Sequence, residues 1–329
     1  MFKGDFAMPL RFLIVGAGAI GGYFGGRLLE AGAAVTFLVR PRRAAELART
    51  GLTIQSRFGN AMLRAPACVL AEELREPFDV VLLSCKAYDL TGAMDSFGPA
   101  VGPETAILPL LNGMRHLEVL DGRFGAKHVL GGECVISATL DANGGVVHLN
   151  DAHTLLFGER NGAGSERVQT IATAFGRAKF DGRPTNTILQ GMWEKWVFIA
   201  AAAGITCLMR ATMGDIVEAG AAEFGSTLLE ECAAIAARQG FPPREAFVDQ
   251  NRRIFTAAGS PLTASMLRDI ERGAPIEADH IVGDLLQRAG QEEPERTLLL
   301  RIAFSHLKAY EARRARETGG PNAAHKISA

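Results

Sequence analysis

Residues 11–21 read Arg-Phe-Leu-Ile-Val-Gly-Ala-Gly-Ala-Ile-Gly, an apolar run that ends in a glycine-rich turn. The spacing G-x-G-x-x-G between a predicted strand and a predicted helix is typical of a dinucleotide-binding turn. Gly16 would permit the tight turn, Gly18 would let backbone N–H groups approach a pyrophosphate, and Gly21 would let the helix pack closely on the sheet. We therefore expect the turn to bind a cofactor through Gly16, Ala17, Gly18, Ala19, Ile20 and Gly21.

A second apolar run, residues 35–39, ends on Arg40. Enzymes that use NAD usually carry Asp or Glu at this point, for the 2′-hydroxyl of the ribose. Here Arg42 and Arg43 follow closely, and the first acidic residue is Glu46. The fork of donors on a guanidinium suits a 2′-phosphate, although a solvated charge at a strand end is the simpler alternative. The chain is therefore predicted to bind NADP(H).

The bulk composition limits the class of protein. The chain has 329 residues, of which 48% are hydrophobic, so it is long enough for two domains with a sizeable core. Its 35 basic and 36 acidic residues give a net charge of −1, which provides no field to attract nucleic acid or a membrane surface. The five cysteines are scattered without a C-x-x-C pair, which favours reduced core thiols in the cytoplasm and no metal site.

The sequence predicts neither a signal peptide nor a transmembrane helix. Residues 1–9 lack the apolar core of a signal peptide, and Met8 is an alternative start. The most apolar window, residues 196–209, is short of the ~20 residues that cross a bilayer. It predicts a buried helix.

Strand and helix patterns alternate through the first half, with buried strands at 78–85 and 106–111 and a short one at 128–132. Short alternating runs over 135–158 predict antiparallel strands added at the edge of the sheet. We predict an α/β fold with a Rossmann-type domain over 9–185, an all-helical domain over 186–316 and a disordered tail over 317–329. Helices are expected near 165–177, 188–209, 213–219, 221–239, 243–257, 263–272, 277–290 and 294–315.

Polar residues follow two of the predicted strands. Lys86 comes after strand 78–85, and Asn112 comes after strand 106–111. Ligands of parallel α/β sheets bind at the carboxyl ends of the strands, so Lys86 would meet ribose or phosphate oxygens and Asn112 a nicotinamide ribose or a substrate. The structural alternative for Asn112 is a simple turn, because Asn-Gly is a favoured turn dipeptide.

The second half carries Lys195 at the head of an otherwise apolar helix. Desolvation of a lysine favours its neutral form, which would fit Lys195 to donate a proton near neutral pH, whereas a surface anchor is the alternative. Further on, Ser265 could cap a helix and Glu277 could complement a helix dipole.

Together these residues resemble the ketopantoate reductase (2-dehydropantoate 2-reductase) family along nearly the whole chain. The resemblance rests on the glycine turn with Arg40, Lys86, the loop Asn112-Gly113-Met114 and Trp193-x-Lys195. The signature Ser265-Met-Leu-x-Asp269, followed by Gly273 and Glu277-x-Asp279, is more specific to the family than the glycine turn.

The resemblance implies NADPH-dependent reduction of 2-dehydropantoate to pantoate, in pantothenate biosynthesis, by a homodimer. Lys195 would protonate the developing alkoxide, and Glu277 would bind the hydroxyl of the substrate. Ser265 would bind the substrate carboxylate, and Asn112 would contact both substrate and cofactor. Arg40 would hold the 2′-phosphate, and Lys86 would lie along the cofactor.

The chain departs from the family pattern on one helix face. The family has Asn four and eight residues after the catalytic lysine, where this chain has Ile199 and Ala203. This spacing places all three on one face, so Ile199 and Ala203 are expected to line the substrate site. An unmet buried hydroxyl costs about 1–3 kcal/mol, which favours the alternative of a related NADPH-dependent reductase for a less polar 2-oxo acid.

Two further classes stay open from the residues alone. One is an NADPH-binding sensor without turnover, which would need neither Lys195 nor Glu277. The other is a β-hydroxyacid dehydrogenase, which also pairs a glycine-turn domain with a helical one. The Ser265-Met-Leu-x-Asp269 signature points away from it.

Overall fold

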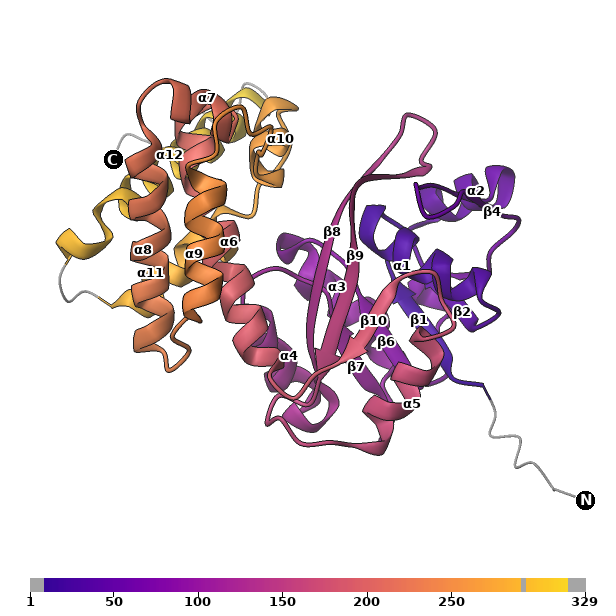
Figure 1. The fold of residues 1–329 in the computed structure, drawn as a ribbon. Helices are drawn as coiled ribbons and strands as arrows, with labels where there is room; N and C mark the ends of the chain where they lie inside the picture. The colour runs from indigo at the N-terminus through magenta and orange to yellow at the C-terminus, as the bar shows by residue number, and fades with distance from the viewer. Residues whose placement is uncertain (1–8, 291–293, 319–329) are drawn as a thin grey trace, which may run out of the picture. The chain divides into compact units, whose positions relative to one another are not determined.

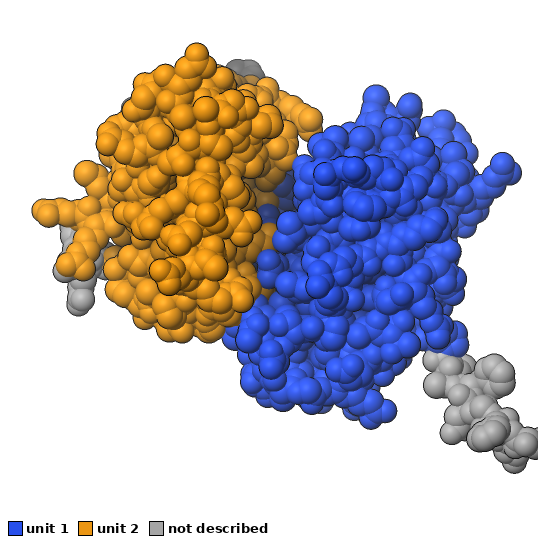
Figure 2. All heavy atoms as spheres, in the orientation of Figure 1, with its two compact units in different colours: residues 1–189 blue, residues 190–329 orange. Residues whose placement is uncertain are grey.

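The computed structural model describes residues 9–290 and 294–318 of the chain. The chain divides into two compact units, residues 1–189 and 190–329 (Figure 2). The predicted fold class is confirmed: the first unit is an α/β unit built on a parallel sheet, and the described part of the second is helical (Figure 1). The expectations about Met1–Met8 and about residues 319–329 lie outside the described residues.

The first sheet of unit 1 is parallel throughout and has the order β5-β2-β1-β6-β7. Its strands are β1 (Arg11–Val15), β2 (Ala34–Leu38), β5 (Cys68–Val69), β6 (Val80–Leu83) and β7 (Ala106–Pro109). All four residues of β6 and of β7 are buried, as expected for strands covered on both faces. Since the strands are parallel, their carboxyl ends share one edge of the sheet.

Helix α1 (Ala19–Glu30) follows the glycine turn and packs between two sheets through pairs of glycines. A Cβ on Gly25 would come within 2.8 Å of Ile14 and Phe37 of the first sheet. One on Gly22 would lie 2.9 Å from Val146, and one on Gly26 would lie 2.7 Å from Ile54, both of the second sheet. The helix therefore has backbone-close contacts on two of its faces.

The second sheet of unit 1 corrects one expectation. Strands β8 (Gly131–Leu140) and β9 (Val146–Gly158) are antiparallel, as predicted, but they belong to a separate sheet and not to the edge of the first. There β9 pairs with β3 (Leu52–Gln55) and β10 (Asp181–Pro184), and β3 pairs with β4 (Ala61–Leu63). The physical reason is α1, whose second glycine face needs a sheet of its own to pack against.

The remaining helices of unit 1 connect these strands. They are α2 (Pro41–Thr50), α3 (Leu90–Phe97), α4 (Arg115–Phe124) and α5 (Glu166–Phe175). Ser165 caps α5, because its hydroxyl accepts a hydrogen bond from the Val168 amide at 3.3 Å. The strand expected at 128–132 is displaced: a 3₁₀ turn covers 126–128, and β8 begins at Gly131.

Unit 2 consists of helices around one long apolar helix. They are α6 (Ile188–Met209), α7 (Met213–Glu218), α8 (Ala222–Arg238), α9 (Glu245–Phe255), α10 (Ser265–Glu271), α11 (Asp284–Ala289) and α12 (Leu298–Thr318). The helix expected over 277–290 is present over 278–289, and it contains a π-helical turn, Asp279–Gly283, which leads directly into α11. Helix α12 ends at Thr318, so the first two residues of the expected tail are helical.

Helix α6 is longer than its apolar window suggests. Its 22 residues make it, among the described residues, long and apolar enough to span a membrane by length and composition, which corrects the estimate from residues 196–209. However, 72% of its most apolar window is buried inside the structure. Such burial is typical of a core helix, which passes the same test of length and composition.

Candidate functional site

The glycine turn has the geometry that its sequence predicts. Gly16 adopts a φ of +92°, which side chains rarely tolerate. A Cβ on Gly21 would lie 2.1 Å from the Gly16 carbonyl oxygen and 2.3 Å from the Ser84 hydroxyl, so only glycine fits there. By contrast, a Cβ on Gly18 would meet nothing within 4 Å. The turn is thus closely packed at Gly21 and open at Gly18, which leaves the space that a bound phosphate group requires.

The residues between the glycines complete the N-terminus of α1. Ala19 and Ile20, both half-buried, are its first residues, and Gly18 is the N-cap. Among the described residues no side chain caps this end, so its amides and dipole suit an anion. Ala17 is 3% exposed, and its carbonyl oxygen accepts a hydrogen bond from Arg43 Nε at 3.0 Å.

The three arginines after β2 have different roles. The Arg40 side chain is 83% exposed and donates to Asp89 Oδ1 at 3.0 Å, while that of Arg42 is 93% exposed. The Arg43 side chain is only 16% exposed and donates also to the Gly144 carbonyl oxygen at 2.8 Å. Arg43 therefore ties the glycine turn to the β8–β9 hairpin, and Arg40 and Arg42 are the cations that an approaching anion would meet.

Lys86 and Asn112 lie on the same edge of the first sheet as the glycine turn. Lys86 follows β6 as the N-cap of a 3₁₀ turn, Ala87–Asp89, and Asn112 follows β7. Gly113, the next residue, has a φ of +75°, which supports the turn reading of this dipeptide alongside the functional one. Both side chains belong to half-buried residues. The structure therefore brings Gly16, Arg40, Lys86 and Asn112 to one edge of parallel strands.

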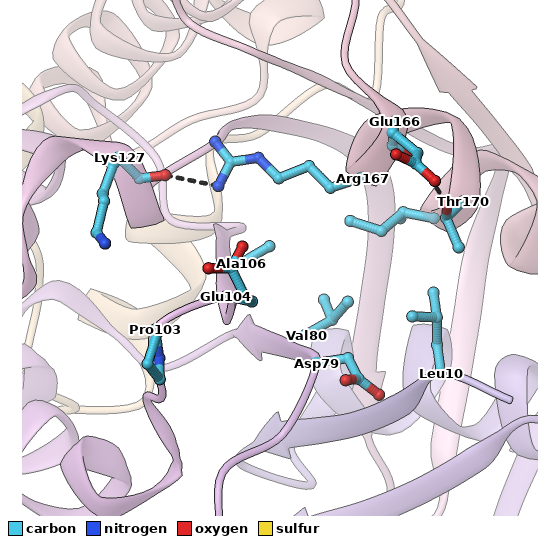
Figure 3. A pocket seen from close by; sticks show the side chains of 11 residues that line it. Leu10, Asp79, Val80, Pro103, Glu104, Ala106, Lys127, Glu166, Arg167 and Thr170 are labelled. Carbon is cyan, nitrogen blue, oxygen red and sulfur yellow. Dashed lines mark hydrogen bonds between the residues drawn. The ribbon is translucent and has the colours of Figure 1, made fainter. Parts of the chain in front are cut away.

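A cavity of about 550 Å³ lies at the opposite end of this sheet (Figure 3). Its walls include Leu10, Val80 and Ala106, where β1, β6 and β7 begin. Arg167 crosses one wall and donates to the Lys127 carbonyl oxygen. None of the expected site residues is among the described residues that line it. This cavity is thus separate from the glycine turn.

In unit 2, Lys195 lies two turns inside α6, which corrects its expected place at the head of the helix. The residue is half-buried. Ile199 and Ala203 follow on the same face at intervals of four residues. Ile199 is half-buried, and Ala203 is 3% exposed. The face beyond Lys195 is therefore apolar and closes progressively into the core.

An ion pair between a buried carboxylate and a largely exposed arginine fixes the turn of α6 that carries Lys195. Glu194 is 3% exposed, and its carboxylate accepts hydrogen bonds from the Arg244 amide at 2.9 Å and from Arg244 Nε at 2.9 Å. Burial alone would raise the pKa of Glu194, but the hydrogen bonds from Arg244 outweigh it and lower that pKa. The carboxylate therefore stays charged and anchors the start of α9.

Ser265 is the first residue of α10 and is exposed. Ala264 is the N-cap, so the interpretation of Ser265 as a cap is wrong, and the Ser265 hydroxyl does not cap the helix. The Ala264 amide donates to Thr206 Oγ1 of α6 at 3.3 Å. Helix α6 thereby holds the start of α10.

Glu277 lies just before the π-helical turn and is half-buried. Its carbonyl oxygen accepts from the Ile281 amide at 2.9 Å. Asp279, the first residue of the turn, forms an ion pair with Lys308 of α12 at 2.9 Å. The segment that carries Glu277 is thus held from α12.

Within residues 9–290 and 294–318, the side chains form neither a candidate metal-ligand group nor a disulfide. The described residues contain no group of three or more His, Cys, Asp or Glu that could hold a metal ion. The five cysteines, all in the described part of the chain, form no disulfide. Burial raises the pKa of Cys207 to about 12 and also raises that of Cys232, which favours the protonated thiol over the nucleophilic thiolate.

A glycine turn on a parallel sheet, followed by a helical unit with a lysine on its central helix, defines the class of two-unit Rossmann-type proteins. Comparison with known proteins gives the family. Residues 12–162 match the model described as ketopantoate reductase PanE/ApbA, and residues 187–311 match that of its C-terminal part. The chain belongs to the ketopantoate reductase family, a family of oxidoreductases.

Individual relatives agree over nearly their whole length. The chain is 38% identical to the "uncharacterized oxidoreductase YkpB" of Bacillus subtilis, over 92% of this chain and 99% of that protein. It is 29% identical to a 2-dehydropantoate 2-reductase of Mesorhizobium japonicum, over 83% and 89%. The crystal structure of 2-dehydropantoate 2-reductase from Methylococcus capsulatus aligns with a TM-score of 0.79 at 30% identity, over 93% and 98%.

Proposed function

We propose that the protein reduces 2-dehydropantoate to pantoate with NADPH, as a step of pantothenate biosynthesis. The observation that carries the proposal is the presence of Lys195 on the central helix of a chain whose two halves both match ketopantoate reductases. Relatives named 2-dehydropantoate 2-reductase support the substrate. In this proposal unit 1 binds the cofactor and unit 2 supplies the acid–base groups.

The residues of unit 1 fit a phosphorylated dinucleotide. The open space above Gly18 and the uncapped amides of α1 suit the pyrophosphate, and the exposed Arg40 suits a 2′-phosphate. Lys86 and Asn112 would bind along the cofactor from the same sheet edge. The bound cofactor would supply a hydride to C2 of the 2-oxo acid.

The residues of unit 2 would handle the charge that develops on the substrate. The Lys195 ammonium would hydrogen-bond the C2 oxygen and give it a proton as the alkoxide forms. Glu277 would accept a hydrogen bond from the hydroxyl of the substrate, and Ser265 would donate one to its carboxylate. Asn112 would contact the substrate as well as the cofactor.

A second candidate substrate is a less polar 2-oxo acid. The observation that favours it is the apolar face of α6, where Ile199 and the buried Ala203 follow Lys195. These side chains offer no hydrogen bond to a substrate hydroxyl, whereas they would pack well on a branched alkyl group. Lys195 and Ser265 would keep the same roles.

A substrate panel separates these candidates. We would measure NADPH oxidation with 2-dehydropantoate and with 3-methyl-2-oxobutanoate, which differs by lacking the terminal hydroxymethyl group. A higher kcat/KM for 2-dehydropantoate supports the main proposal, and the reverse order supports the second. NADPH binding without turnover of any 2-oxo acid would instead support the alternative of an NADPH-binding sensor. Ile199→Asn restores an amide and should shift the preference toward 2-dehydropantoate.

We further propose that the enzyme is a cytoplasmic homodimer. The even charge balance and the undisulfided, mostly buried cysteines support a reducing compartment. The family membership supports a dimer, and one protein of similar fold is described as a dimeric ketopantoate reductase. Sedimentation equilibrium of the purified chain tests it, since a monomer at micromolar concentration would contradict it.

A further inference from the structure

Trp196 is the residue next to Lys195 and joins α6 to the segment that follows Glu277. Its indole Nε1–H donates to the Ile281 carbonyl oxygen at 2.8 Å. The side chain is 0% exposed, the largest among the fully buried ones in the structure. An indole N–H at this depth has no access to water, so this hydrogen bond is costly to lose.

The acceptor lies in an unusual piece of backbone. Ile281 is in the middle of the π-helical turn Asp279–Gly283, where the Asp284 amide reaches back five residues to the Asp279 carbonyl oxygen. π-helices are rare, appear mostly as single turns inside α-helices, and are frequent at functional sites. The indole of Trp196 thus holds the turn at its centre.

A cation holds the indole from another side. The Arg288 guanidinium lies 5.6 Å from the Trp196 ring and 5.8 Å from that of Trp193. Arg288 Nε also donates to Asp284 Oδ2 at 3.1 Å, at the residue that ends the π turn. The ring is therefore fixed in orientation, and its N–H direction is fixed with it.

We propose that Trp196 is a positioning residue, whose indole N–H sets the Glu277 segment relative to Lys195. This inference rests on the proposed function. Lys195 and Trp196 are consecutive on one rigid helix, so any shift of the Ile281 backbone moves Glu277 against Lys195. A 1 Å displacement between catalytic groups is enough to slow a reaction severely.

Trp196→Phe tests the proposal because it removes the N–H and keeps an aromatic ring. We expect kcat to fall about tenfold or more, with the dissociation constant of NADPH unchanged. We also expect the pH profile of kcat to move, since the surroundings of Lys195 change. A variant that is merely less well folded would lower the active fraction and leave the profile in place.

A double-mutant cycle with Glu277→Gln shows whether Trp196 acts through this segment. We expect the double variant to lose no more kcat than Glu277→Gln alone, within about twofold, since coupled residues are not additive. If the fold-losses of kcat in the two single variants multiply in the double variant, the proposal is overturned. It is also overturned if Trp196→Phe keeps the kcat and the pH profile of the wild type. Trp193→Phe is the matched control, because Trp193 contacts Trp196 and Phe241 through its ring, at 4.9 and 5.5 Å.

A second replacement covers the case in which Trp196→Phe does not fold. The chain has two tryptophans, so in a Trp193→Phe background the analogue benzothienylalanine replaces Trp196 alone. It keeps the bicyclic shape and substitutes sulfur for the N–H. A fall in kcat with this analogue supports the proposal, and unchanged kcat overturns it. A wild-type enzyme that reduces no 2-oxo acid would instead overturn the proposed function, and the inference with it.

Discussion

The glycine turn of unit 1 and the acid–base residues of unit 2 are assembled in opposite ways. In unit 1 the glycine turn is one continuous strand–turn–helix, and its geometry follows from three glycines within six residues, Gly16, Gly18 and Gly21. In unit 2 the residues come from three segments spread from Lys195 to Glu277, which α6 joins through Thr206 and Trp196. The difference teaches that a binding turn is encoded locally, whereas an acid–base site depends on the packing of a whole helical unit.

The sharpest test of this division is Lys195→Ala. We expect kcat for the preferred 2-oxo acid to fall about 10²- to 10⁴-fold, because the proton donor is removed. Binding of NADPH, measured by fluorescence titration, should stay as in the wild type. Lys127→Ala, at the cavity on the far end of the first sheet, is the control and should keep full activity. Loss of NADPH binding in Lys195→Ala would contradict the assignment of cofactor binding to unit 1 and acid–base chemistry to unit 2.

Gly21→Ala makes the converse change in unit 1. Its Cβ would lie 2.1 Å from the Gly16 carbonyl oxygen, so we expect unfolding free energy to fall by about 1–3 kcal/mol and NADPH binding to be lost. Urea denaturation and fluorescence titration measure the two effects. Gly92→Ala on α3 is the matched control, since its Cβ meets nothing within 4 Å. It should be neutral or stabilise by up to about 1 kcal/mol.

Arg244→Met tests the packing side of the comparison. Removing the partner of the buried Glu194 carboxylate should destabilise the protein by about 1–3 kcal/mol at pH 7. The pKa of Glu194 is lowered in the folded state, so its stabilisation is complete above the ordinary carboxyl pKa and is lost as pH falls through the folded value. Denaturation curves of both proteins should therefore converge as pH falls through the lowered folded-state pKa of Glu194, below the ordinary carboxyl range.

The exposed pair of Arg252 with Glu230 supplies the control for this experiment. Its side chains are 49% and 56% exposed, so Arg252→Met should cost no more than about 0.5 kcal/mol at any pH. An equal loss in the two variants would mean that Glu194 contributes only as a surface charge.

The smallest expected effect is that of Arg40→Ala. NADPH should bind about five- to tenfold more weakly, and NADH should bind as before, because in the proposed complex the guanidinium would contact only the 2′-phosphate. The effect is modest because the side chain is 83% exposed and screened by solvent. Arg49→Ala, also exposed on α2, should change neither affinity. Equal weakening of both cofactors would show that Arg40 does not recognise the phosphate.

Local signals explain what was predictable. The apolar run before Gly16 and the glycine spacing specify β1, the turn and α1 without reference to the rest of the chain. The long helices of unit 2 were equally visible, because their apolar residues recur over many turns. The candidate site residues themselves stay predictions, since positions on the fold do not establish roles.

Long-range packing explains what was missed. Strand β10 is Asp-Gly-Arg-Pro, which has no strand pattern and pairs only because β9 offers it an edge. Arg43 cannot be told from Arg40 by sequence, because only the fold places the Gly144 carbonyl beside it. Trp196 donates to a residue 85 positions away, and no spacing rule anticipates a π turn there.

The π turn has a consequence for the phase of the helix that contains it. A turn with five-residue hydrogen bonds accommodates one more residue than an α-helical turn does. Each α-helical residue advances about 100° around the axis, so the extra residue rotates everything before Asp279 by that angle relative to α11. Deleting one residue within Asp279–Gly283 would restore a regular helix and leave the composition almost unchanged. It would also turn the Glu277 side chain to another side of that helix. The direction of this side chain therefore depends on the one extra residue that the π turn accommodates.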